Sequence, residues 1–106
     1  MGTVVSASKI KEKEVEKKKM LFMNIFTWEP EKTDEVVKRR VAEEIPEGYK
    51  MIGEWTDLGS NRVFRLFEVA DPKVILQVNF AWNDLGNVEL VPVMEAEEAL
   101  KLLPKS

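Results

Sequence analysis

The most suggestive polar pair in the sequence is Glu54 and Arg65. They lie on either side of a glycine-containing turn, and a hairpin that pairs Asp57 with Arg62 would bring them opposite each other. Asn24 would lie on the neighbouring strand. Such a set can bind an anionic or carbonyl-bearing ligand, with Arg65 as the donor and Asn24 as the orienting amide. Because cross-strand pairs of opposite charge are common, the favoured interpretation is an ion pair that fixes register and contributes about 0.2–1 kcal/mol.

The three tryptophans form a second candidate constellation. Trp28, Trp55 and Trp82 can line a flat pocket for an aromatic ligand, although packing in cores and interfaces is the commoner use of such side chains. Asn79 and Asn83, one helical turn apart, could also orient a ligand, but a solvated helix face is the favoured explanation. No catalytic residue can be assigned, and the ligand-binding candidates are Asn24, Glu54, Trp55, Arg65 and Trp82.

The sequence contains no cysteine and no histidine. Disulfides, thiol nucleophiles and redox dithiols are therefore excluded. Without histidine, the usual ligands of zinc, haem and non-haem iron are missing, and so is the commonest general base. An Asp-rich calcium loop is also absent. We therefore expect no metal site and no cofactor.

Charge is unevenly distributed along the chain. Residues 1–19 contain six lysines and three glutamates, whereas residues 20–106 carry 10 basic and 16 acidic side chains. An acidic body argues against a nucleic-acid partner, and Arg62–Phe67 lacks the glycines of an RNA-recognition motif. No apolar run is long enough to span a membrane and no secretory signal occurs, so we expect a cytoplasmic protein without a membrane partner. Abundant lysine and glutamate favour a thermophilic source.

Residues 1–19 are interpreted as a Lys/Glu-rich extension, flexible or helical, that precedes a single domain over residues 20–106. Two other interpretations stay open. Residues 1–6 fit the N-myristoylation pattern, and the lysines that follow could add a second membrane-binding signal. Alternatively, the biological start is Met20, where the folded pattern begins.

The stretch that must position Asn24 runs from Met20 to Trp28, and it is apolar on both alternating faces and uncharged. A strand of this kind belongs in the centre of a sheet with packing on each side. A chain of 106 residues has too few helices to cover both faces of a sheet. We therefore expect helices on one face and a second copy of the protein on the other.

Two helices are predicted, over residues 31–45 and about 72–85, because each follows an acidic residue and a proline. The buried stripe of the first is Val37, Val41 and Ile45. That of the second is Val74, Ile75, Val78, Ala81, Trp82 and Leu85, with Gly86 ending the helix. A short helix over residues 95–103 closes the domain, and its Ala99, Leu100 and Leu103 are expected to cover Leu76 and Phe80, unless a partner does so.

Further strands are predicted over residues 49–57, 62–69 and 87–94. Pro92 cannot donate a ladder hydrogen bond, so the last strand should lie at an edge or switch partners at this residue. The resulting order is βαββαβ followed by a helix. It predicts an α+β, ferredoxin-like fold: a four-stranded antiparallel sheet with both helices on one face.

Alternation along the strands divides the sheet into two apolar faces. The face that carries Leu21, Met23, Ile25, Trp55 and Phe64 is expected beneath the helices. The opposite face is too apolar for water and should meet the same face of a second copy. We expect a homodimer or a higher homo-oligomer, with interface candidates Phe22, Phe26, Trp28, Phe67, Val91 and Val93.

Four short segments resemble a prokaryotic family, domain of unknown function 3303, over about residues 20–100. They are Met20-Leu21-Phe22-Met23, Pro46-Glu47-Gly48, Trp82-Asn83-Asp84-Leu85 and Val91-Pro92-Val93. The resemblance implies a dimeric α/β barrel, a superfamily that includes cofactor-free monooxygenases, muconolactone isomerase, haem-binding chlorite dismutases and amino-acid-sensing domains. A haem role would need a histidine that this chain lacks.

The expected function is therefore that of a homodimeric small-molecule-binding module. The alternative is a cofactor-independent enzyme of the monooxygenase or isomerase type, acting on a small aromatic or carbonyl-containing substrate in a pocket between sheet and helices lined by Trp55 and Trp82. A purely structural oligomerisation domain is a third possibility.

Overall fold

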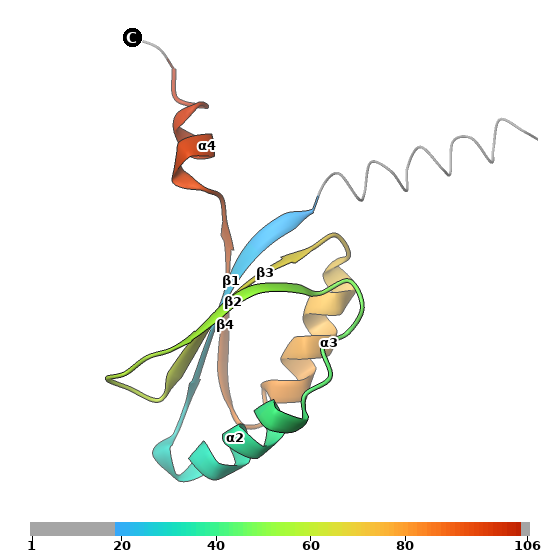
Figure 1. The fold of residues 1–106 in the computed structure, drawn as a ribbon, viewed down its shortest axis with the longest axis vertical. Coiled ribbons are helices and arrows are strands. Elements are labelled where there is room, and N and C mark those ends of the chain that lie inside the picture. The colour runs from blue at the N-terminus through green and yellow to red at the C-terminus, as the bar shows by residue number, and fades with distance from the viewer. Residues whose placement is uncertain (1–18, 105–106) are drawn as a thin grey trace, which may run out of the picture.

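The computed structural model describes residues 19–104, so nearly all of the predicted N-terminal extension lies outside the described residues. The elements are β1 (Met20–Trp28), the 3-10 helix η1 (Pro30–Lys32), α2 (Thr33–Ala42), β2 (Lys50–Thr56), β3 (Arg62–Val69), α3 (Pro72–Trp82), β4 (Gly86–Val93) and α4 (Ala96–Leu100). The four strands form one antiparallel sheet in the order β2-β3-β1-β4. Helices α2 and α3 cover the same face of this sheet (Figure 1). The predicted ferredoxin-like arrangement is confirmed.

Strand β1 occupies the interior position that its two apolar faces predicted, between β3 and β4. Strand β4 lies at one edge of the sheet, as Pro92 predicted, because an edge strand tolerates a residue without an N–H group. The predicted hairpin register is also correct. Glu54 pairs with Arg65 and Trp55 pairs with Phe64.

The face beneath the helices is the opposite of the expected one. Phe26 and Phe67 belong to the core that α2 and α3 cover, and Phe22 and Trp28 pack against it. The cause is that both faces of β1 are apolar, so the pattern alone could not show which of them the helices cover. A bulge in β2 has a smaller effect: Met51 pairs with Phe67, but Gly53 already pairs with the next residue, Leu66. Counting in steps of two fails across this bulge, which changes the face only of the residues before it, such as Met51.

Four of the interface candidates are therefore wrong in their placement. Phe22, Phe26, Trp28 and Phe67 are covered by the helices of their own chain, and Phe67 is 0% exposed. The other two candidates, Val91 and Val93, pair with residues 23 and 21 on the helix-free face.

Helix α2 packs less tightly than its predicted stripe implied. Only Val36 is buried, whereas Val37 and Val41 are exposed. Glu43 has extended backbone angles, so the helix ends at Ala42 and does not include Ile45. The predicted stripe of this helix was therefore wrong, and α2 rests on the sheet through very little buried surface.

Helix α3 follows its prediction more closely. The Asp71 carboxylate accepts a hydrogen bond from the backbone N–H of Lys73 at 2.9 Å, and Pro72 occupies the first helical position. Val74, Ile75, Val78 and Trp82 are buried, as is Leu85 just after the helix, although Ala81 is exposed.

Gly86 begins β4 and does not cap α3, which ends at Trp82. It pairs with Trp28, and a Cβ at this position would collide with the backbone oxygen of Thr27. The glycine therefore permits a close approach of the two strands.

Helix α4 does not cover Leu76 and Phe80 as expected. It projects beyond the end of the sheet, away from α3 (Figure 1), and all residues from 94 to 104 are exposed. Leu76 and Phe80 are 51% and 68% exposed. Within residues 19–104, no helix is long and apolar enough to cross a membrane.

We expect Gly86→Ala to destabilise the protein by about 1–3 kcal/mol, because the added methyl group must push β4 away from the β1 backbone. Urea unfolding measures this difference. The matched control is Gly59→Ala in the hairpin turn, where the new Cβ would meet its nearest neighbour at an ordinary 3.6 Å. A Gly86→Ala variant as stable as Gly59→Ala would contradict the packing of this strand pair.

Candidate functional site

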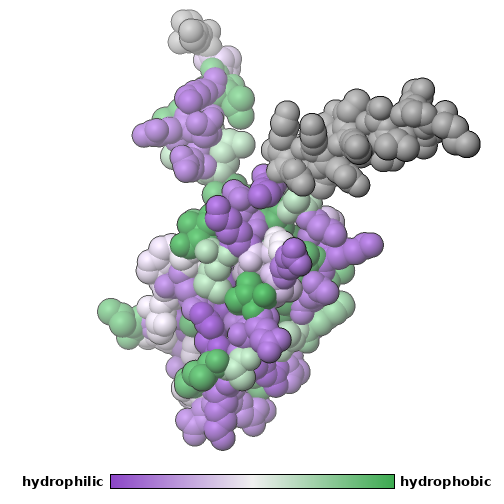
Figure 2. Space-filling model, turned by 45° about the vertical axis from the view of Figure 1, so that its right-hand side comes forward, coloured by the Kyte–Doolittle hydropathy of each residue, from purple (hydrophilic) through white to green (hydrophobic). Residues whose placement is uncertain are grey.

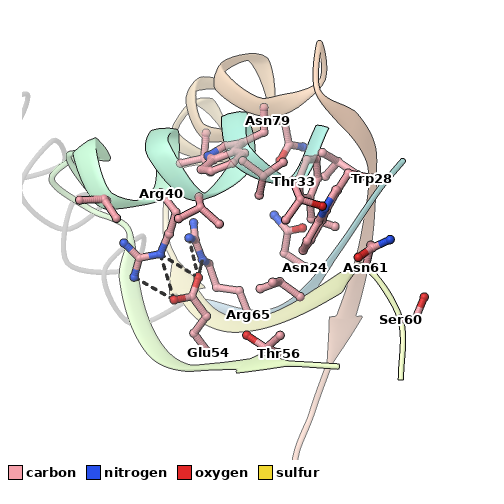
Figure 3. A pocket seen from close by; sticks show the side chains of 18 residues that line it. Asn24, Trp28, Thr33, Arg40, Glu54, Thr56, Ser60, Asn61, Arg65 and Asn79 are labelled. Carbon is pink, nitrogen blue, oxygen red and sulfur yellow. Dashed lines mark hydrogen bonds and ion pairs between the residues drawn. The ribbon is translucent and has the colours of Figure 1, made fainter. Parts of the chain in front are cut away.

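A cavity of about 410 Å³ lies between the sheet and the two helices α2 and α3 (Figure 3). Its walls are mostly valine and aromatic side chains, which include Phe26, Trp28 and Trp82. Val37 and Val41, which are exposed on α2, also line it. The polar residues at its surface are Asn24, Thr33, Arg40, Glu54, Thr56, Ser60, Asn61, Arg65 and Asn79.

A polar row crosses the sheet under this cavity. Arg65 on β3 pairs with Glu54 on β2 and with Asn24 on β1. Three adjacent strands thus place one polar residue each on the same line. The sequence predicted this row, but on the face that would meet a second copy.

Arg65 is the centre of a buried ion-pair network. Its side chain is 8% exposed and donates hydrogen bonds to Glu43 at 2.9 and 3.1 Å and to Glu54 at 2.8 and 3.2 Å. Arg40, from α2, donates to both carboxylate oxygens of Glu54, the shortest distance being 2.8 Å. The Trp82 indole N–H donates to Glu43 at 3.1 Å. Two positive and two negative side chains make the net charge of this network zero.

Glu54 and Arg65 stay ionised around neutral pH. Burial alone would raise the pKa of Glu54, but hydrogen bonds from Arg40 and Arg65 outweigh it and hold the pKa below its ordinary value. Burial alone would lower the pKa of Arg65, but hydrogen bonds to Glu43 and Glu54 keep it above the ordinary value. Burial raises the pKa of the adjacent Tyr49 phenol to about 12, so this hydroxyl is protonated and neutral.

Two side-chain amides at the cavity have an unused acceptor. The Oδ1 atoms of Asn24 and Asn79 are buried and have no hydrogen-bond partner among the described residues. A buried acceptor left unpaired costs about 1–3 kcal/mol, so such groups in a folded protein call for an explanation. In Figure 3, Asn24 rises from the sheet between Arg65 and Trp28, and Asn79 lies on the helical side of the same space.

The end of the cavity near the β2–β3 turn is held by local hydrogen bonds. The Trp28 indole N–H donates to the Thr33 hydroxyl at 3.1 Å, and this hydroxyl donates to the Pro30 carbonyl at 2.7 Å. The Trp28 backbone N–H donates to the Asn61 carbonyl at 3.1 Å. Both N–H groups of Trp28 are thus paired, and its ring serves as an apolar wall.

Four of the five ligand-binding candidates meet at this cavity: Asn24, Glu54, Arg65 and Trp82. Trp55 does not. It pairs with Phe64 on the helix-free face and is 53% exposed, so Trp55 and Trp82 cannot line one pocket. Within residues 19–104, no three His, Cys, Asp or Glu side chains gather as they would around a metal ion.

Several polar residues of the cavity and of its ion-pair network were not among the ligand-binding candidates, and Asn79, Arg40 and Glu43 are the main ones. Asn79 joins the cavity, whereas Asn83 at the end of α3 is exposed. Arg40 and Glu43 lie outside the buried stripe predicted for their helix, which was Val37, Val41 and Ile45. Arg40 reaches inward because its long side chain extends to Glu54, and Glu43 turns inward because the helix ends just before it. Periodicity carries no signal for either of these two effects.

A single family model matches nearly all of the residues that the structure describes. The family model described as Domain of unknown function (DUF3303) matches residues 20–106, which begins at the first residue of β1. The resemblance found in the sequence is thereby confirmed. No curated protein and no solved structure matches the chain. The family description names no activity, so the chemistry must be read from the cavity.

We expect Arg65→Met to destabilise the protein by about 3–5 kcal/mol, because it leaves Glu43 and Glu54 buried without their shared partner. The control is Arg62→Met, which breaks the more exposed hairpin pair with Asp57 and should cost at most about 1 kcal/mol. Urea unfolding of both variants measures the difference. Equal losses would mean that Arg65 is no more than the cross-strand pair inferred from the sequence.

Proposed function

We propose that this chain, which belongs to the family described as a domain of unknown function (DUF3303), binds a small, neutral, mostly apolar molecule that carries two hydrogen-bond donors. One observation carries the proposal: the unpaired amide oxygens of Asn24 and Asn79 at an apolar cavity. The cavity volume of about 410 Å³ lies in the range of small-molecule sites, which combine apolar walls with a few convergent polar groups.

The walls support a planar, aromatic ligand. The rings of Phe26 and Trp28 stack with centroids 5.6 Å apart, and Phe26 meets Trp82 edge-on at 5.3 Å. These three rings form a continuous aromatic surface beside valines 36, 63, 78 and 88. A flat ligand gains both apolar contact and ring–ring contact on such a surface.

The charges support a neutral ligand. Arg65 and Arg40 are both engaged by carboxylates, and the network has no net charge. An anionic ligand would have to displace Glu43 or Glu54 and would leave that carboxylate buried without a partner. The unpaired Asn24 and Asn79 oxygens instead call for O–H or N–H donors. A hydroxylated or amino-substituted aromatic molecule meets both conditions.

The same chemistry favours binding over catalysis. Glu54 is the carboxylate at the cavity wall, and hydrogen bonds from Arg40 and Arg65 lower its pKa and weaken it as a base. The Tyr49 hydroxyl, with a pKa of about 12, does not line the cavity. The monooxygenase or isomerase alternative therefore has no supporting observation in the site.

A homodimer with its sheets face to face completes the proposal. The helix-free face of the sheet, called here the open face, carries Leu21, Met23, Ile25, Trp55, Phe64, Leu66, Val91 and Val93. Trp55 lies along β2 over Gly53, where a Cβ would come within 2.6 Å of the indole. An apolar sheet face of this extent favours a partner, and a second copy buries it symmetrically. A cytoplasmic location stays a prediction from the sequence.

Ligand binding is tested with neutral hydroxylated aromatics such as phenol, catechol and 2-naphthol, followed by the fluorescence of the cavity tryptophans. We expect Asn24→Leu to weaken binding of the best ligand at least about 10-fold, because one hydrogen bond of about 1.5 kcal/mol is lost. The free Asn24→Leu protein should be as stable as the wild type or more so, because an unpaired buried acceptor is removed.

The matched control for this test is Asn83→Leu, at the exposed end of α3, which should change neither property. A loss of stability in Asn24→Leu with unchanged affinity would contradict the proposed role of the amide. Oxygen uptake with the bound catechol, above that of buffer, would show catalysis in place of simple binding.

The dimer is tested by sedimentation equilibrium at micromolar concentration. We expect the wild type to be dimeric and Leu66→Lys, near the centre of the open face, to be a folded monomer, because it would bury an unpaired charge. The control is Leu58→Lys at the fully exposed hairpin tip, which should remain dimeric. A monomeric wild type would refute the assembly.

A further inference from the structure

The cavity between the sheet and the two long helices has room for more than one aromatic ring. Its volume is about 410 Å³, whereas a closed apolar cavity of about 150 Å³ is enough for benzene. A ring whose donors meet the Asn24 and Asn79 oxygens therefore leaves more than half of the cavity unfilled. Unfilled space beside apolar walls forfeits apolar burial and van der Waals contact, so a ligand that fits this site extends beyond its ring.

The two ends of the cavity differ in their access to water. The amide oxygens of Asn24 and Asn79 are buried, so the donor groups of a ligand must lie deep in the site. Val37 and Val41 also line the cavity, yet these residues are 54% and 82% exposed. Residues that line a cavity and face solvent at the same time mark its mouth. The mouth therefore lies beside α2, and the ligand extends towards it.

The two sides of this mouth differ in polarity. Thr56 and Ser60, at the β2–β3 hairpin, are the other exposed residues of the cavity lining, and Thr56 lies across the space from Asn79 (Figure 3). A ligand that leaves the cavity meets hydroxyl groups on the sheet side and valine methyl groups on the α2 side. Arg40 is also partly exposed, but Glu54 engages it, so no free charge is offered to an anionic group. A neutral, apolar chain therefore follows α2.

Exposed apolar side chains alone do not mark a site on this protein. Figure 2 shows small apolar groups scattered among polar ones over the body of the molecule, as on most protein surfaces. Val37 and Val41 differ because they lie one helical turn apart, adjoin the cavity and contribute nothing to the buried core. A chain laid along them removes apolar surface of both partners from water.

We propose that the ligand is a neutral aromatic molecule with hydrogen-bond donors at one end and an alkyl chain at the other. The donor-bearing ring lies at Asn24 and Asn79, and the chain runs out of the cavity along Val37 and Val41. These two valines select the length of the chain and its position on the ring. This inference rests on the proposed function, to which it adds the shape of the ligand and its orientation.

The test compares catechol with 4-ethylcatechol, 4-butylcatechol and 3-butylcatechol, each titrated under argon into the full chain and followed by tryptophan fluorescence. Burial of one methylene group is worth up to about 4-fold in affinity, so we expect 4-butylcatechol to bind at least about 10-fold more tightly than catechol. The isomer 3-butylcatechol is equally apolar but carries its chain beside the donors. It should bind at least about 10-fold more weakly than 4-butylcatechol, because its chain cannot reach the mouth while its donors meet the amides.

A double variant, Val37→Thr with Val41→Thr, keeps the shape of both side chains but makes this side of the mouth polar. We expect the ratio of the affinities for 4-butylcatechol and catechol to fall at least about 3-fold. The control is Ala42→Ser, which is exposed on α2 outside the cavity lining and should leave this ratio unchanged.

The outcomes separate this inference from the function on which it rests. Equal affinities of the two butyl isomers, or no gain from catechol to 4-butylcatechol, would overturn the inference and leave the proposed function intact. An unchanged ratio in the double variant would do the same. If none of the four catechols binds, both are overturned.

Discussion

The arrangement of this domain depends on the guanidinium of Arg65. It lies in the interior on β3 and is held by Glu54 from β2 and by Glu43 from the end of α2, which in turn accepts the indole N–H of Trp82 on α3. A buried charge is tolerated only when its partners surround it, so these elements are constrained to converge on one point. Helix α2 buries a single side chain, and its hold on the sheet is therefore largely electrostatic.

The cavity follows from this constraint. A charged network and the amide of Asn24 occupy positions where a ferredoxin-like sheet could carry apolar residues that pack against the helix above. The valines of α2 are short and do not fill the room above this polar row. Space is therefore left between the helix and the sheet. The polar groups that hold the helix in place thus also prevent it from closing on the sheet. The site and the stability of the domain share the same residues.

The sequence was sufficient for the topology, because β1 is apolar on both faces and because acidic residue–proline pairs precede both long helices. It also gave the pairing of Glu54 with Arg65, since the turn between them fixes the register. It could not give the face on which this pair lies. Both faces of β1 are apolar, so a period-two pattern cannot show which of them the helices cover.

The remaining site residues were hidden for a different reason. Arg40 and Glu43 look like ordinary solvated charges in a helical pattern, and only the reach of one side chain and the position of the helix end direct them inward. Trp55 was placed correctly beside Phe64, but the face that these two residues share is the open one and not the one beneath the helices. Helix α4 projects beyond the sheet instead of covering α3, and local propensity does not encode the direction of a helix.

Pro92 sits in an outermost strand, and this limits how the protein can aggregate. Edge strands offer free backbone groups on which further strands can add without end, which is the first step towards fibrils. A proline contributes no N–H there and interrupts any continuous ladder along β4. Addition of further strands at this edge is therefore disfavoured. A chain with so much exposed apolar area avoids open-ended growth when it associates through a surface that a single partner covers.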